Sequence, residues 1–130
     1  MAEKKEICSE ACAEDWASDW RTLVSVWGLP GVAMLGAVWF EPAPRAVVWS
    51  LLLVWMGAAC LVNARRCGRT HCRFTGPFFL LMAALVVAHA VGALPFGPYG
   101  WEILGGMTVL GNALIWWVSE RLLGTFRRIA

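Results

Sequence analysis

Residues 65–73 read Arg-Arg-Cys-Gly-Arg-Thr-His-Cys-Arg and place two thiols and an imidazole in a short basic segment. A second thiol pair lies near the beginning of the chain. Thiolate and imidazole are the ligands that zinc, copper(I) and other soft ions prefer in proteins. Flanking arginines favour the thiolate form, and Gly68 allows the segment to turn between the ligands. The candidate ligands of a single metal site are therefore Cys8, Cys12, Cys67 and Cys72, with His71 as an alternative ligand.

The spacing of these cysteines leaves three interpretations open. The pairs are Cys-x3-Cys and Cys-x4-Cys, whereas zinc ribbons and thioredoxin-like motifs use Cys-x2-Cys. Metal or thiol chemistry is the first interpretation, and small buried thiols with a structural role are the second. Thiol–disulfide exchange is the third. No Ser-His-Asp set, carboxylate pair or phosphate-binding glycine motif is visible in the sequence, so we do not expect an enzyme.

Three further residues could extend such a site into the apolar part of the chain, namely His89, Cys60 and Glu102. An ionisable side chain inside an apolar span is a functional candidate by default, so these residues form a candidate ion pathway. The alternative for His89 is a neutral imidazole that hydrogen-bonds another helix through Asn112, Thr108 or Glu102. The alternative for Cys60 is a small hydrophobic side chain.

The segments that must position these residues are strongly apolar. The chain has 130 residues, of which 59% are hydrophobic and only 15% charged, against about 25% charged in soluble domains. Its apolar stretches are each about 17–19 residues long, the short end for a helix that crosses a bilayer. They do not alternate as membrane β-strands do. The sequence predicts an all-α bundle of four transmembrane helices over Thr22–Phe40, Ala46–Val62, Pro77–Leu94 and Trp101–Val118.

The remaining segments divide the chain into three parts. Residues 1–21 are acidic, and a stripe of Cys8, Cys12, Trp16 and Trp20 at four-residue spacing predicts an amphipathic surface helix over 6–20. Residues 22–118 form the membrane domain, and 119–130 form a basic tail. We expect Pro30 and Gly31 to kink the first span. We expect Asn63–Gly76 to form the second connection and Pro77 to begin the third span.

The distribution of positive charge predicts the orientation. With four spans, the beginning of the chain, the second connection and the tail share one side of the membrane. Ten of the eleven Lys and Arg residues lie on that side, which the positive-inside rule places in the cytoplasm. These residues are Lys4, Lys5, Arg21, Arg65, Arg66, Arg69, Arg73, Arg121, Arg127 and Arg128. The candidate thiols then meet in a compartment that keeps them reduced.

The arginines of the second connection have a second interpretation. Arg65, Arg66, Arg69 and Arg73 are candidates for binding phosphate or lipid headgroups. The alternative is that they only set the topology. Because topology already accounts for the basic residues, we expect no nucleic-acid partner.

In general build, the chain resembles the small bacterial inner-membrane proteins of mercuric-ion uptake, of the MerC and MerT type, with few spans and cysteine pairs. That resemblance implies a membrane protein that handles mercury(II). Those proteins hold a cysteine pair within the first span, whereas Thr22–Phe40 contains none. The stretch Asn63-x-x-Arg66-Cys67-Gly68-Arg69-x-His71-Cys72-x-x-Thr75-Gly76-Pro77 looks like a signature of small prokaryotic membrane proteins. It implies no particular activity.

Two hypotheses follow for the role of the chain. The first is a multi-pass inner-membrane protein, with both termini cytoplasmic, that binds zinc, copper(I) or mercury(II) through its thiols in ion uptake or transfer. The second is a non-catalytic accessory subunit of a larger membrane complex, in which the cysteine site is structural. In either case the lipid bilayer is a partner, and a membrane protein or a second copy of the chain is a candidate partner.

Overall fold

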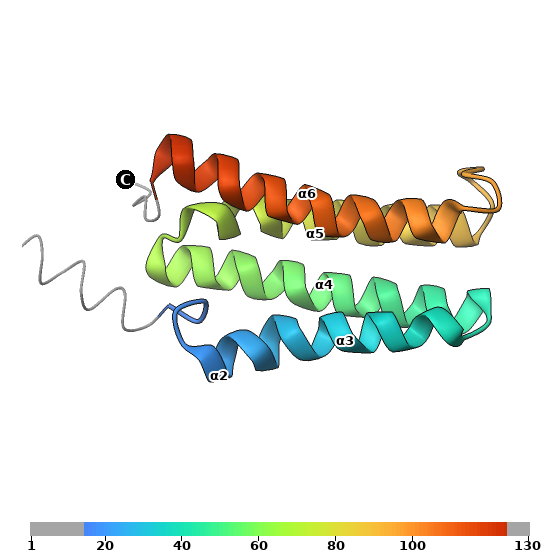
Figure 1. Cartoon of the computed structure of the whole chain (residues 1–130), viewed down its shortest axis with the longest axis horizontal. Helices are drawn as coiled ribbons and strands as arrows, with labels where there is room; N and C mark the ends of the chain where they lie inside the picture. The colour runs from blue at the N-terminus through green and yellow to red at the C-terminus, as the bar shows by residue number, and fades with distance from the viewer. Residues whose placement is uncertain (1–14, 125–130) are drawn as a thin grey trace, which may run out of the picture.

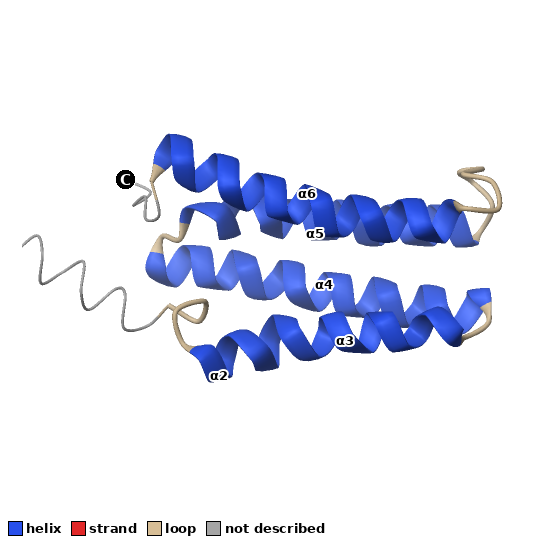
Figure 2. Ribbon diagram, viewed as in Figure 1, coloured by secondary structure: helices blue, strands red, loops and turns tan. Residues whose placement is uncertain are grey.

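The computed structural model describes residues 15–124, which form four helical rods lying side by side (Figures 1 and 2). The first rod combines four short elements, and each of the others is one long α-helix. This confirms the all-α prediction and its four helical stretches. The elements are α2 (Trp20–Leu23), η1 (Val24–Gly28), α3 (Leu29–Gly36), η2 (Ala37–Trp39), α4 (Pro42–Cys67), α5 (Thr70–Ala90) and α6 (Gly100–Leu123).

Three of the four rods are long and apolar enough to cross a membrane. These candidate spans are Trp20–Trp39, Pro42–Cys67 and Thr70–Ala90. The fourth rod, α6, has 24 residues, which is ample length, but it carries Glu102 and Asn112 within its apolar stretch. The chain therefore has the character of a multi-pass membrane protein, and a fourth span remains a prediction.

The long connection expected over Asn63–Gly76 is wrong. Helix α4 continues to Cys67 and α5 begins at Thr70, so only Gly68 and Arg69 separate them. Pro77 lies inside α5 rather than at its start. A proline costs one backbone hydrogen bond within a helix, and packing against neighbouring helices makes this tolerable in membrane proteins.

The first rod departs from regular α-helical geometry just before Pro30. Pro30 stands in the first turn of α3, directly after the π-helical turn Val24–Gly28. A wider turn accommodates a proline that cannot donate to the preceding carbonyl. The disruption expected at Pro30 and Gly31 therefore takes the form of a π turn.

The prediction of an amphipathic helix over 6–20 is wrong for residues 15–19, which the structure describes. Asp15–Asp19 form a turn, in which Ser18 N–H donates to the Asp15 carbonyl at 3.1 Å. The Asp19 side chain then accepts from Thr22 N–H at 3.2 Å and caps the first rod. Residues 6–14, with Cys8 and Cys12, lie outside the described residues.

Helices α4 and α5 form the centre of the bundle because their backbones touch. A Cβ added to Gly57 would lie 2.9 Å from the Gly76 carbonyl oxygen, and one added to Gly76 would lie 2.7 Å from Leu61 Cγ. Small residues allow such close approach between membrane helices. Gly76 therefore serves the contact between helices rather than the start of one.

The outer rods pack on this pair from either side. The first rod packs along α4, and α6 packs along α5. In Figure 1 the first rod and α6 lie nearer the viewer than α4 and α5. The arrangement is a trough with α4 and α5 as its floor. The buried core comprises the fully enclosed side chains of Leu53, Met82, Val86 and Leu104, with others around them.

The end of the bundle at the first and third connections is closed by aromatic residues and one arginine. Arg45 donates to the Val38 and Phe40 carbonyls at 2.6 and 2.8 Å, and its guanidinium lies 5.0 Å from the Trp101 ring centre. Trp49 contacts Trp101 edge-on at 5.5 Å. A cation near a helix C-terminus satisfies its last carbonyls, so Arg45 secures the end of the first rod.

We predict that Gly57→Ala destabilises the bundle. The new methyl group would press on the Gly76 carbonyl, and overpacking of this kind costs about 1–3 kcal/mol. Gly106→Ala is the matched control, because it also lies inside a helix and its Cβ would meet nothing within 4 Å. Thermal unfolding of the detergent-solubilised protein should place Gly57→Ala below the control. Equal stability would contradict direct backbone contact between α4 and α5.

Candidate functional site

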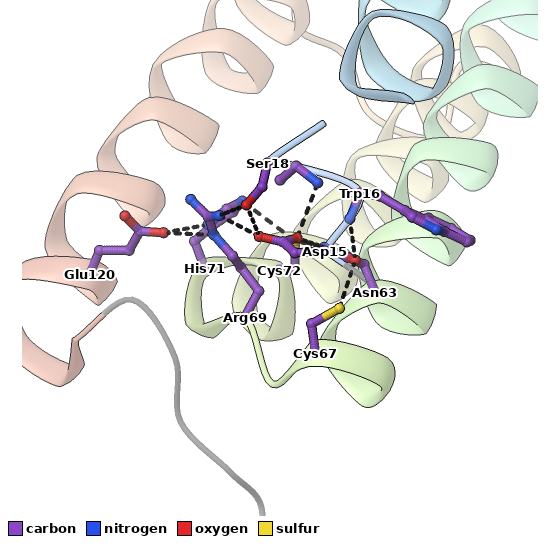
Figure 3. Close-up of polar contacts among 10 residues, drawn as sticks. Asp15, Trp16, Ser18, Asn63, Cys67, Arg69, His71, Cys72 and Glu120 are labelled. Carbon is purple, nitrogen blue, oxygen red and sulfur yellow. Dashed lines mark hydrogen bonds and ion pairs between the residues drawn. The ribbon is translucent and has the colours of Figure 1, made fainter. Parts of the chain in front are cut away.

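One end of the bundle gathers polar residues from all parts of the described chain. Figure 3 shows Asp15 from the N-terminal turn, Asn63 from α4, Arg69 from the α4–α5 turn, and Glu120 from α6 close together. Trp16 N–H donates to Asn63 Oδ1 at 3.1 Å. The beginning of the described chain, the second connection and the end of α6 therefore meet at one end, as the charge distribution predicts.

The turn between α4 and α5 is short because Gly68 adopts a left-handed conformation. Its φ is 68°, and its N–H donates to the Ala64 carbonyl at 2.9 Å to close the last turn of α4. Glycine adopts this conformation without steric cost. Arg69 follows directly, so its side chain is fixed between the two helix ends.

Asp15 is a buried carboxylate with several hydrogen-bond donors. Asn63 Nδ2 donates to its Oδ1 at 2.8 Å and Ser18 Oγ to its Oδ2 at 2.8 Å, and Arg69 forms an ion pair with it. Burial acts to raise the pKa of Asp15. The hydrogen bonds from Asn63, Arg69, Ser18 and the Ala17 N–H outweigh burial, so the pKa lies below its ordinary value of 3.8.

Arg69 joins Asp15 to the last helix. Its Nε donates to Glu120 Oε1 at 3.2 Å, and its side chain is only 12% exposed. Burial acts to lower the pKa of Arg69, but the two carboxylates raise it above its ordinary value. Burial acts to raise the pKa of Glu120, while hydrogen bonds from His71 and Trp116 and the charge of Arg69 bring it below 4.5. All three groups are therefore charged at neutral pH.

His71 connects this ionic cluster to a thiol. Its Nδ1 lies 2.8 Å from Glu120 Oε1 and its Nε2 lies 3.4 Å from Cys72 Sγ. A carboxylate can only accept, so Nδ1 carries the proton and Nε2 of the neutral ring is free to accept from the thiol. The ring stacks on Trp116, with centres 4.4 Å apart and planes within 13°. The Glu120 contact and the Trp116 stack therefore fix the orientation of the His71 ring.

Cys60 is the unexpected neighbour of Cys72. The two thiols, one from α4 and one from the first turn of α5, are neighbours in the bundle. Trp27 Nε1 of the first rod donates to Cys60 Sγ at 3.3 Å. Both cysteines are free and almost fully buried, at 2% and 0% exposure. Two protein thiols are thus held together at the inner wall of the bundle.

Cys67 lies on the other side of Asn63. Its Sγ donates to Asn63 Oδ1 at 3.6 Å, and Asn63 Nδ2 lies 3.5 Å from Cys72 Sγ. The Asn63 amide, itself fully buried, therefore stands between the two thiols of the predicted Cys67–Cys72 pair. It also bonds Asp15 and Trp16.

The predicted metal site is only partly visible. Cys8 and Cys12 lie outside residues 15–124, so a four-sulfur site that includes them stays a prediction. Within the described part, no three His, Cys, Asp or Glu side chains are grouped to hold one metal ion. The structure places Cys72 beside His71 and, separately, beside Cys60, and the Asn63 amide lies between Cys72 and Cys67.

The candidate pathway residues His89 and Glu102 lie at the opposite end of the bundle. His89 is 17 residues after Cys72 on the same helix, or about 25 Å along its axis. His89 Nδ1 donates a hydrogen bond to the Leu94 carbonyl at 3.2 Å, and the imidazole ring contacts Phe96 and Trp101. It braces the third connection, so the expected bonds to Asn112, Thr108 or Glu102 are wrong. Glu102 is exposed.

The four arginines of the second connection have different environments. Arg65, Arg66 and Arg73 are exposed, and the Arg66 guanidinium lies 5.0 Å from the Trp16 ring centre. Arg69 is occupied by Asp15 and Glu120. Headgroup binding therefore remains a prediction for the three exposed arginines, and Arg69 is not available for it.

Sequence reasoning missed Asp15, Glu120 and Trp27 as parts of this site. The signal for the two carboxylates was available in principle. A buried arginine at a helix junction needs anionic partners, and these acids lie at the two chain segments that charge places beside it. No pattern marks Trp27, because its indole N–H reaches Cys60 only through the packing of the first rod on α4.

Comparison with known proteins adds no identification. No protein-family model, curated protein or solved structure matches the chain.

We predict that acid weakens the contacts of Asp15 and Glu120. Their folded pKa values lie below 3.8 and 4.5, so the unfolded chain binds more protons and stability falls as the pH drops below about 4.5. Asp15→Asn should lower the free energy of unfolding at pH 7 by about 1–3 kcal/mol, because Arg69 loses a charged partner. Its stability should then fall less between pH 5 and 3, a range of about two pH units around these ordinary values.

Asp19→Asn is the matched control, since Asp19 is exposed and asparagine caps a helix equally well. Melting temperatures followed by tryptophan fluorescence measure both variants across this pH range. If Asp15→Asn and Asp19→Asn behave alike, Asp15 does not stabilise the folded chain.

Proposed function

We propose that this chain is a four-span membrane protein that binds a soft metal ion between Cys60 and Cys72. Copper(I) and mercury(II) are the favoured ions, because thiolates select soft ions and these accept two sulfur ligands in a line. Zinc is less suitable, since it requires about four ligands in a structural site. The observation that carries the proposal is that two buried free thiols from different helices are neighbours.

His71 supports metal binding at this thiol pair. Binding requires both thiols to lose their protons. His71 Nε2, at 3.4 Å from Cys72 Sγ, is placed to take one of these protons, and the other is released to solvent. Glu120 at His71 Nδ1 stabilises the resulting imidazolium. Two thiolates and a monovalent ion carry one net negative charge, and the protonated imidazole beside them neutralises it.

The orientation that we propose places this site at the cytoplasmic face. Arg65, Arg66 and Arg73 surround the end that holds the thiols, whereas Arg45 is the one Lys or Arg at the other end of the described chain. The positive-inside rule then favours the cytoplasm for the thiol end. This requires α6 to cross the membrane as the fourth span, and its packing along α5 supports that.

The resemblance in build to mercuric-ion uptake proteins agrees with a soft ion but does not extend to a route through the bilayer. Between His89 and Cys72, helix α5 carries no further metal-ligating His, Cys, Asp or Glu. We therefore propose receipt or transfer of the ion at the inner face, where Cys8 and Cys12 are candidates for handing it on.

A non-catalytic accessory subunit is the second candidate, and one observation favours it. The site is well hydrogen-bonded without a metal, because Asn63 contacts Cys67, Cys72, Asp15 and Trp16. Such a network would fix the beginning of the chain to the α4–α5 turn. In that case the thiols contribute only packing, and the purified protein would hold no stoichiometric metal.

We predict that Cys60→Ser and Cys72→Ser each weaken copper(I) binding by more than about 100-fold, since each removes one of two direct ligands. Cys67→Ser is the matched control, and it should retain binding because Cys67 contacts Asn63 instead. Copper content of the reduced protein, measured against a competing copper(I) chelator, distinguishes the variants. Loss of copper in Cys67→Ser with retention in Cys60→Ser would restore the originally predicted ligand set and contradict this one.

The proposed topology predicts the reactivity of single cysteines with a membrane-impermeant maleimide. In a variant whose natural cysteines are replaced by serine, Ser18→Cys and Arg121→Cys should react from the same face of sealed vesicles. Glu41→Cys should react from the opposite face, because one span separates it from Ser18. Reaction of Arg121→Cys together with Glu41→Cys would show that α6 does not cross the bilayer.

A further inference from the structure

The trough between the first rod and α6 leaves one side of the bundle without a protein partner. A cavity of about 780 Å³ lies there, with walls from the first rod and α6 and a floor from α4 and α5. Only 17% of the apolar stretch of the first rod is buried within the chain, against 39% for α4 and 44% for α5. In a membrane, such a surface is covered either by lipid chains or by another helix. The side chains that line the trough decide between the two.

Asn112 lines the α6 wall of the trough and makes no hydrogen bond in the described part of the chain. One turn earlier, Thr108 satisfies its hydroxyl by donating to the Leu104 carbonyl at 2.8 Å. Asn112 stands 12 residues after Gly100 and 11 before Leu123, so its amide is about 17 Å from either end of the helix. If α6 is a span, this is the middle of the bilayer, where lipid chains offer no hydrogen-bond partner. The amide therefore favours a protein segment in the trough.

The walls of the trough suit a helix as the occupant. Val109 and Ala113 flank Asn112 on the α6 wall, and both are exposed. On the facing wall, a Cβ added to Gly31 of the first rod would meet nothing within 4 Å. Among the described residues that line the trough there is no Asp, Glu, Lys or Arg, so an apolar helix meets no unpaired charge. Short side chains let membrane helices approach closely, and an asparagine amide then bonds across the contact.

We propose that α6 of a second copy occupies the trough, with the two copies related by a twofold axis along the membrane normal and with Asn112 facing the partner's Asn112 near that axis. A twofold contact brings the same patch of both copies together, so a residue at the axis meets its own copy. An amide carries both donors and an acceptor, so two asparagines can exchange two hydrogen bonds. Asn112 is thus its own complement. The inference rests on α6 crossing the bilayer, as in the proposed topology.

The dimer would also enclose one side of the proposed metal site. Cys60 and His71 line the same trough, so a second copy seated there covers the side of these residues that faces the cavity. The contact itself needs no ion, because Asn112 and apolar side chains form it. Dimerisation is therefore measured on the metal-free protein, and copper(I) binding is measured separately.

Sedimentation equilibrium of the full chain in density-matched detergent micelles tests the proposal. The wild type should dimerise, and Asn112→Leu should raise the dissociation constant of the dimer about tenfold, because the amide pair is lost. Asn112→Gln keeps an amide and should dimerise nearly as well as the wild type. Leu110→Ala is the control, because Leu110 is exposed on α6 but does not line the trough. A monomeric wild type, or an Asn112→Leu variant that dimerises as well as the wild type, would overturn the proposal.

Oxidative cross-linking in lipid vesicles locates the contact with Asn112 intact. In the variant without natural cysteines, Val109→Cys should form a cross-linked dimer, because Val109 lies on the trough wall beside Asn112. Leu110→Cys is the neighbouring position outside the trough and should not cross-link. Cross-linking through Leu110→Cys alone would place the contact on another face of α6 and reject the trough.

Copper(I) content separates this inference from the proposed metal binding. A dimer that binds no copper(I) would contradict the metal site alone, whereas a copper-binding monomer would contradict the dimer alone. Loss of the fourth span in the maleimide experiment would remove the reason for a partner at Asn112 and overturn the dimer, whatever the copper content.

Discussion

The buried charge of Arg69 is the constraint on which the polar end of this protein depends. A guanidinium enclosed at the end of an apolar bundle is tolerated only with anionic partners close by. The partners are Asp15, before the first rod, and Glu120, at the end of the last rod. One side chain therefore holds together the first turn, the α4–α5 hairpin and α6. The orientation of His71 follows from this, since Glu120 bonds both Arg69 and His71.

The second determinant is the direct contact of α4 with α5. Because glycine backbones touch there, the two helices form a narrow floor, and the outer rods pack on its edges rather than on each other. This arrangement explains why the bundle is open along one side. It also explains why Cys60 and Cys72, from the two central helices, meet inside the bundle rather than in the solvent.

The sequence predicts the helical class, the four apolar stretches and the shared end of the chain segments. These follow from composition and charge, which do not depend on details of packing. The helix limits around residues 63–76 are wrong because Gly76 and Pro77 are common terminators, and only the contact with Gly57 shows that they belong inside a helix. The Cys60–Cys72 pair is not predictable from spacing, because it depends on the register of two helices joined by two residues. Likewise, a histidine in an apolar span suggests an ion pathway, but the contacts of His89 with Leu94 and Trp101 show that it stabilises the third connection.

The two-residue turn at Gly68 and Arg69 has a consequence for how such a chain can vary over time. Each α-helical residue advances the direction of the side chains by about 100°. One inserted or deleted residue between Asn63 and Cys72 would rotate His71 and Cys72 away from Glu120 and Cys60 unless a second change restored the phase. Length variation should therefore be excluded at this hairpin, where one residue sets the direction of every side chain that follows in α5.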